Sequence, residues 1–201
     1  MGYFIGFAPW IVYWVLVGNT SFLTSALVAM VLFVVLIVVD VRKQRRPKVL
    51  EIGGLVFFAL MVVLALVTND SDVERWLTPA STAAILVIAV IGVLVGRPFV
   101  RDYALETVSP EIAQTESFRH VTVQLTWVWI AAFAVMTVSS AIPPLTDGAA
   151  TIRDGADGLS IVCYWIIPFA AIGLAAVVSK SYPARVHREA VAAASASASA
   201  R

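Results

Sequence analysis

Apolar residues are concentrated in six long stretches of the chain, and polar residues fall between them. Five of the stretches are close to 20 residues long, about the length that a helix needs to cross roughly 30 Å of hydrocarbon at 1.5 Å per residue. Glu51 is the only formal charge within them, and the third stretch shares it with the polar connection 40–51. The pattern predicts an all-α, polytopic membrane helix bundle with about six spans: residues 3–17, 20–39, 49–68, 77–96, 121–142 and 159–179.

The first stretch, residues 3–17, is shorter than the others and is interrupted by Pro9. It lacks the basic region and the small-residue cleavage site of a secretory signal peptide. We interpret it as a short first span, with a re-entrant or interfacial segment as the alternative. Gly18-Asn19-Thr20 predicts a tight turn into the second helix, with Thr20 or Ser21 as the N-cap.

Two further signals mark helix ends between the fourth and fifth spans. Gly96 can adopt a positive φ where the fourth span ends, and Pro98 prevents the helix from continuing. Ser109-Pro110-Glu111 is typical of a helix start, so a short interfacial helix is expected near residues 110–120.

The chain is predicted to form a single transmembrane domain over residues 1–180. Residues 181–201 form a basic, Ala/Ser-rich tail that is expected to be cytoplasmic. Alanine propensity would extend a helix through this tail, whereas its low complexity would leave it disordered.

Basic residues alternate between the two sides of the predicted bundle. Of the 14 basic residues, 12 lie in the second-to-third connection, the fourth-to-fifth connection or the tail. The other two are Arg75 and Arg153. Because Lys and Arg mark the cytoplasmic side, the alternation predicts six spans with both termini in the cytoplasm. The residues expected to contact lipid headgroups or a partner protein are Arg42, Lys43, Arg45, Arg46, Lys48, Arg97, Arg101 and Arg119.

The composition agrees with a membrane protein. The chain is 60% hydrophobic and 13% charged, whereas soluble domains carry about 25% charged residues. Its net charge of +1 gives no argument for nucleic-acid binding. Cys163 is the single cysteine, and neither His120 nor His187 has metal-ligand spacing to another ligand.

Motifs for catalysis or cofactor binding are absent from the sequence: there is no Walker motif, no G-x-G-x-x-G, no H-E-x-x-H and no G-x-S-x-G. We therefore predict a protein that is not an enzyme and needs no cofactor or metal. Asp70, Asp72 and Glu74 could attract a divalent cation, but they lack the glycine turn of a calcium loop, so a solvated outer loop is favoured.

Hydroxyl and amide side chains occur within the spans. Ser and Thr on membrane helices usually bond to their own backbone or pack at helix contacts. Gln124 and Thr126, beside Trp127, are the candidates for a polar pocket.

Short motifs at the ends of the spans follow a characteristic order. They are Phe7-Ala8-Pro9, Thr24-Ser25-Ala26-Leu27, the basic run from Arg42 to Lys48, Asn69-Asp70 leading to Trp76, Gly96-Arg97-Pro98-Phe99, Trp127 and a final basic tail. In this order the chain resembles the bacterial intracellular septation protein A family of inner-membrane proteins. It departs from that family in its long acidic connection after the fifth span, in an insertion at residues 103–111, and in lacking a Trp-Lys pair after Trp76.

The resemblance implies a non-enzymatic, multi-pass protein of the bacterial inner membrane. Such a protein would serve cell-envelope maintenance, septation and cell division through other membrane or division proteins, and the family provides no catalytic or cofactor-binding residues to carry over. Two alternatives remain open. Scattered polar residues, with Pro9 and Pro168 in spans, are compatible with a small-molecule or lipid transporter, although no inverted repeat is visible. The chain could also be an accessory subunit of a larger membrane complex.

Overall fold

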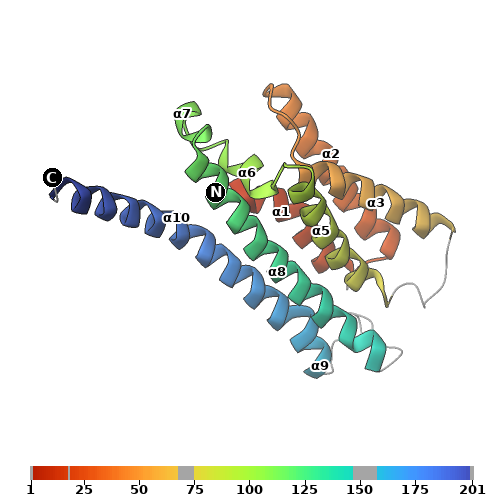
Figure 1. Ribbon diagram of the computed structural model, residues 1–201. Coiled ribbons are helices and arrows are strands. Elements are labelled where there is room, and N and C mark those ends of the chain that lie inside the picture. Colours follow the sequence, from red (N-terminus) through yellow and green to blue (C-terminus); the bar gives the residue numbers. More distant parts are fainter. Residues whose placement is uncertain (1, 18, 68–74, 147–157, 200–201) are drawn as a thin grey trace.

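The computed structural model describes residues 2–17, 19–67, 75–146 and 158–199, and the side chains of residues 6–17, 19–67, 75–146 and 158–183. The described residues form helices joined by short connections (Figure 1). The helices are α1 (Gly2–Val17), α2 (Phe22–Arg42), α3 (Val49–Val67), α5 (Leu77–Leu94), α6 (Phe99–Ala104), α7 (Pro110–Ala113), α8 (Glu116–Thr146), α9 (Gly158–Ile161), a π-helical turn η2 (Val162–Ile166) and α10 (Ile167–Ser199).

Five helical segments are long and apolar enough to cross a membrane. They are α2, α3, α5, α8 and the continuous run Gly158–Pro183 through α9, η2 and α10. The helix α1 is also apolar but has 16 residues, which gives it a length of about 24 Å at 1.5 Å per residue. The prediction of an all-α, multi-pass membrane bundle is therefore confirmed, with five helices of spanning length and one shorter apolar helix.

Most predicted helix ends are found at or near their expected positions. Ser21 is the N-cap of α2, and its side chain accepts a hydrogen bond from the Thr24 amide. Gly96 has the predicted positive φ of 74°. In the tail, α10 continues as a helix through Ser199. Of the two alternatives for the tail, helix or disorder, the structure has the helix.

The short helix expected near residues 110–120 is smaller than that range. It is α7, which covers Pro110–Ala113, and residues from Glu116 onward belong to α8. The Thr115 hydroxyl accepts a hydrogen bond from the Phe118 amide at 3.2 Å. Such a bond caps a new helix, so Thr115 separates α7 from α8.

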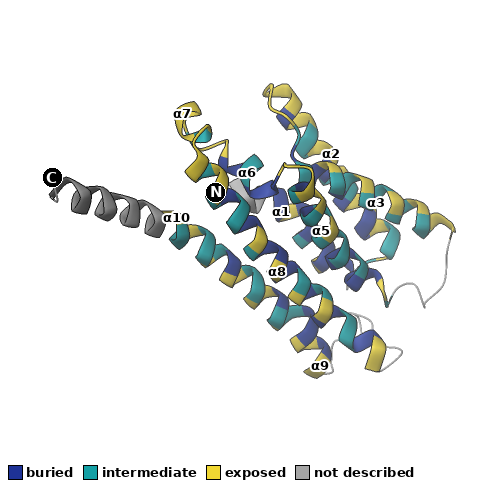
Figure 2. Cartoon of the chain, in the orientation of Figure 1, coloured by how far each residue is buried: buried dark blue, intermediate teal, exposed yellow. Residues whose placement is uncertain are grey.

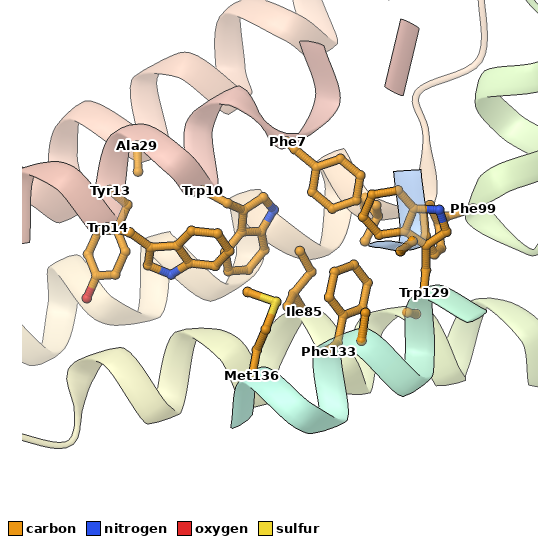
Figure 3. Close-up of a cluster of buried hydrophobic side chains, with 14 of the residues drawn as sticks. Phe7, Trp10, Tyr13, Trp14, Ala29, Ile85, Phe99, Trp129, Phe133 and Met136 are labelled. Atoms are coloured by element: carbon orange, nitrogen blue, oxygen red, sulfur yellow. The ribbon is translucent and has the colours of Figure 1, made fainter. Parts of the chain in front are cut away.

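The helix α1 lies in the middle of the packed bundle. Phe7 of α1 stacks on Trp129 of α8, with ring centroids 5.0 Å apart. One helical turn further on, Trp10 contacts Phe33 of α2 and Phe58 of α3. Figure 3 shows Phe7 and Trp10 of α1, with Trp129 and Phe133 of α8, in the space between these two helices. The first apolar stretch is therefore a core element, to which the longer helices are packed.

A glycine allows two of these neighbours to approach closely. A Cβ on Gly54 of α3 would lie 2.4 Å from the Phe33 ring of α2. Close approach through small residues is a common basis of helix association in lipid, where no hydrophobic force acts between helices.

The long helices carry many exposed residues (Figure 2), and a large share of these are apolar. Soluble proteins rarely expose contiguous apolar surfaces of this extent, so these faces fit contact with lipid. The aliphatic residues of α2 and α3 that are more than half exposed are Val31, Val41, Val56, Leu60, Val63, Leu66 and Val67.

Candidate functional site

A strongly charged depression lies at the end of the bundle where the α2–α3 turn meets α6. Its volume is about 450 Å³. Five of the eight basic residues singled out from the sequence lie in its wall, although the sequence places them in two connections. We call it the basic cleft; its lining residues are Arg45, Arg46, Lys48, Arg97, Arg101, Asp102, Leu105 and Glu106.

The first wall of the basic cleft is built by the end of α2. Gln44 has a left-handed φ of 55°, its amide donates to the Val41 carbonyl at 3.0 Å, and the Arg45 amide donates to the Asp40 carbonyl at 2.9 Å. This pair of bonds is a Schellman motif, which satisfies the last carbonyls of a helix and reverses the chain. It turns Arg45 back toward the bundle.

The end of α5 repeats the same geometry. Gly96 adopts the left-handed conformation, its amide donates to the Val93 carbonyl at 3.0 Å, and the Arg97 amide donates to the Gly92 carbonyl at 2.7 Å. Arg45 and Arg97 therefore occupy equivalent positions, each one residue after the left-handed one. The Arg97 guanidinium also donates to the Pro47 carbonyl at 3.5 Å, which joins the two turns.

Two carboxylates hold the start of α3 beneath the cleft. Glu51 accepts from the Lys48 amide at 3.3 Å, as a glutamate at the third helical position does in a capping box. Asp102 of α6 accepts from the Val49 amide at 3.1 Å. Because the first amides of a helix have no partner within it, these bonds satisfy donors that would otherwise be buried and unpaired.

Lys48 lies at the centre of this region. Its side chain is 8% exposed, and its ammonium contacts Asp40 at 2.5 Å, Glu51 at 3.1 Å and Glu106 at 3.0 Å. It also lies 5.2 Å from the centre of the Tyr103 ring. Burial alone would lower the pKa of Lys48, but the hydrogen bonds to the three carboxylates outweigh burial and raise the pKa above its ordinary value. Lys48 is therefore charged at neutral pH.

The rim of the basic cleft holds weaker ion pairs. Arg45 contacts Glu106 at 3.2 Å, and Arg97 lies 3.7 Å from Asp102, with both arginine side chains about half exposed. Burial raises the pKa of the Asp102 carboxyl, and the Val49 amide and the nearby Arg97 oppose that rise. The first pair joins the α2–α3 turn to the segment that follows α6, and the second joins the end of α5 to α6. In both pairs the arginine is the more exposed partner.

Two arginines of the cleft have no ion pair or hydrogen bond with any side chain that the structure describes. Arg46 is exposed. The Nε of Arg101 is buried and has no hydrogen-bond partner. Burying a donor without a partner is unfavourable, so the Nε–H of Arg101 is available to donate to an acceptor.

The other predicted contact residues lie outside the cleft. Arg42, Lys43 and Arg119 are exposed at the same end of the bundle and do not line it. Lys48 is enclosed by protein rather than exposed at the surface. Sequence reasoning missed its carboxylate partners, although the Lys48–Glu51 spacing is that of a capping box and was available as a signal.

The candidate polar pocket at Gln124, Thr126 and Trp127 is not assembled. Gln124 bonds to His120 and accepts from the Tyr182 hydroxyl. Thr126 is buried and donates to the Thr122 carbonyl, as expected for a hydroxyl on a membrane helix. Trp127 is exposed. The three side chains therefore serve separate contacts.

Hydroxyl groups do meet elsewhere in the interior. Thr82 of α5 and Ser140 of α8 are 3.0 Å apart, and the Trp14 indole of α1 donates to Ser81 at 2.9 Å. The crevice beside Thr82 and Ser140 has a volume of only about 20 Å³. That is room for a water molecule, far below the size of a typical ligand pocket, about 300 Å³ or more.

Within the described ranges, no group of three or more His, Cys, Asp or Glu side chains is placed to hold a metal ion. The acidic residues Asp70, Asp72 and Glu74 fall outside those ranges. No protein-family model, curated protein or solved structure matches this chain.

Proposed function

We propose that this chain is a non-enzymatic, multi-pass scaffold of the bacterial inner membrane that serves the cell envelope and septation by docking a protein partner on its cytoplasmic end. The observation that supports this best is the convergence of its basic connections at one end of the bundle. The contact between Arg45 and Glu106, and that between Arg97 and Pro47, hold these connections together. The packed aromatic interior is consistent with a role at the surface.

The cytoplasmic placement of this end follows from the positive-inside rule. An alkaline phosphatase reporter is active only outside the cytoplasm. Fused after Arg201 it should be inactive, and inserted within residues 147–157 it should be active. The reverse pattern would contradict the orientation.

The partner surface is tested by reversing charges that take no part in the fold. Arg42, Lys43 and Arg119 are exposed, and no hydrogen bond or ion pair joins their side chains to another described residue. In a deletion strain that has a division or envelope defect, the triple change to Glu should abolish complementation while leaving membrane levels normal. Substitution by Gln at the same positions removes the charges without reversing them and should have a smaller effect. Full complementation by the Glu variant would rule out docking at this surface.

A transporter is the second candidate, because Thr82 and Ser140 place two hydroxyls beside an interior crevice. For a transporter, Thr82→Ala or Ser140→Ala would abolish function at normal protein levels, and the charge reversals would be silent. That pattern would replace the scaffold proposal.

A further inference from the structure

Some cationic groups of the basic cleft have no carboxylate partner among the described side chains. Its buried cation, Lys48, is fully engaged by carboxylates. Arg45 and Arg97 each have one carboxylate partner at the rim. Arg46 and Arg101 have neither an ion pair nor a hydrogen bond with a described side chain, and the Arg101 Nε is buried. The cleft therefore offers two uncommitted guanidinium groups to an anion.

The chemistry of these groups favours a phosphate. A guanidinium presents donors in a planar fork that matches two oxygens of a phosphate, and such charge-assisted bonds are stronger than neutral ones. The cleft volume of about 450 Å³ lies within the range of ligand pockets, about 300–1,000 Å³. Asp102 lies close enough to Arg101 to attract it electrostatically, but no ion pair or hydrogen bond between their side chains is formed. The Asp102 carboxylate bonds to the Val49 amide and lies 3.7 Å from Arg97.

Apolar surface continues directly from the cleft along α5. Leu94 is 78% exposed and Val95 is 63% exposed, and they immediately precede Gly96 and Arg97 in the turn that forms the cleft wall. Leu105, within the cleft, is also exposed. A ligand that is anionic at one end and apolar along the rest would cover both surfaces.

We propose that the basic cleft binds the phosphate of an anionic glycerophospholipid through Arg46 and Arg101, with the acyl chains lying along the exposed end of α5. The site would thereby fix the depth and rotation of the bundle at the membrane surface. This inference does not depend on the scaffold role, since it concerns the purified protein and its lipid.

The test uses the full-length chain purified in neutral detergent. Binding of phosphatidylglycerol, phosphatidylcholine and the soluble ester glycerol 3-phosphate is measured by native mass spectrometry and by the shift in thermal unfolding. The wild-type chain should bind phosphatidylglycerol in preference to phosphatidylcholine. Arg46→Gln combined with Arg101→Gln should weaken that binding about tenfold or more, because each loses a charge-assisted bond.

The matched control is Arg42→Gln combined with Lys43→Gln. This variant removes the same charge from the same end of the bundle outside the cleft, and should change the affinity by about twofold or less. Since Arg101 is half buried, the exposed single variant Arg46→Gln is measured beside the double one, and should weaken binding without altering the unfolding temperature in lipid-free detergent.

Three results would overturn the proposal. Equal binding of the two lipids would show that headgroup charge is not recognised. Equal losses in the cleft and control variants would show diffuse attraction to a basic surface rather than a site. Binding of glycerol 3-phosphate as tight as that of phosphatidylglycerol would assign the cleft to a soluble phosphate ester.

Discussion

The aromatic core around α1 and the ionic network beneath the basic cleft are both buried, but they are stabilised differently. In the core, rings are packed against rings, and even polar atoms go without partners: the Trp10 Nε1 and the Tyr13 hydroxyl are buried without a hydrogen bond within the described residues. In the network, Lys48 contacts three carboxylates. The core is stabilised by close packing of side chains, and the network by the balance of its charges. Replacing a side chain should therefore lower the free energy of unfolding for a different reason in each region.

The largest effect is expected from removing the buried cation. Lys48→Met keeps most of the side-chain volume but leaves Asp40, Glu51 and Glu106 without their shared partner. An uncompensated buried charge costs about 3–5 kcal/mol, measured as a lower free energy of unfolding in mixed micelles.

Arg45→Gln is the control for this change, because Arg45 contacts Glu106 from a side chain that is 47% exposed. Exposed pairs contribute about 0–1 kcal/mol. If the two variants were equally stable, the network would not depend on burial as inferred here.

A large cavity in the core should cost somewhat less. Trp10→Ala removes ring contacts with Phe33, Phe57 and Phe58. Truncating a buried aromatic residue costs about 3–5 kcal/mol in soluble proteins. We expect about 3 kcal/mol here, because burial among helices gains no hydrophobic energy over lipid.

Trp127, which is exposed on α8, provides a matched tryptophan. Trp127→Ala should lower the free energy of unfolding by about 1 kcal/mol or less, since only contacts on an outer face are lost. A Trp127 effect as large as that of Trp10 would contradict the central position of α1.

Interior hydroxyls should have smaller effects than either region. Thr82→Ala removes the contact with Ser140, and an interhelical hydrogen bond in a membrane contributes on the order of 0.5–1.5 kcal/mol. A double-mutant cycle with Ser140→Ala isolates the coupling between the two side chains. A coupling energy near zero would mean that each hydroxyl is served by its own backbone.

The smallest effect is a pH dependence at Asp102. Burial raises the pKa of this carboxyl above its ordinary value of 3.8. The folded state therefore holds the proton more tightly than the unfolded state does, and the resulting stabilisation is complete below the unfolded pKa and is lost as the pH rises through the folded pKa. Asp102→Asn keeps an oxygen to accept from the Val49 amide, so its stability profile should lack this component. Superimposable profiles of the two proteins in acid would contradict it.

The helices themselves could be predicted because length and hydropathy determine them. Ser21 and Gly96 carried enough local chemistry to place helix ends correctly. The position of α1 could not be predicted, because in lipid an apolar residue such as Trp10 gives no sign of whether it faces a neighbouring helix or an acyl chain.

The composition of the basic cleft was predictable, but its structure was not. Five of its cations were singled out because they lie in basic connections. The burial of Lys48 depends on α6 bringing Glu106 against the α2–α3 turn, and no local pattern encodes that approach. Left-handed Gln44 was also missed, because a non-glycine residue in that conformation is uncommon.

The central position of α1 has a consequence for how the protein is made. Phe7 stacks on Trp129, so α1 leaves the ribosome roughly 120 residues before a ring on which it packs. At synthesis rates of about 5–20 residues per second, that interval is on the order of ten seconds. During it, the aromatic face of α1 must be sheltered by lipid or by the insertion machinery. Slowing translation between α1 and α8 should therefore lengthen the window in which the nascent chain is open to degradation.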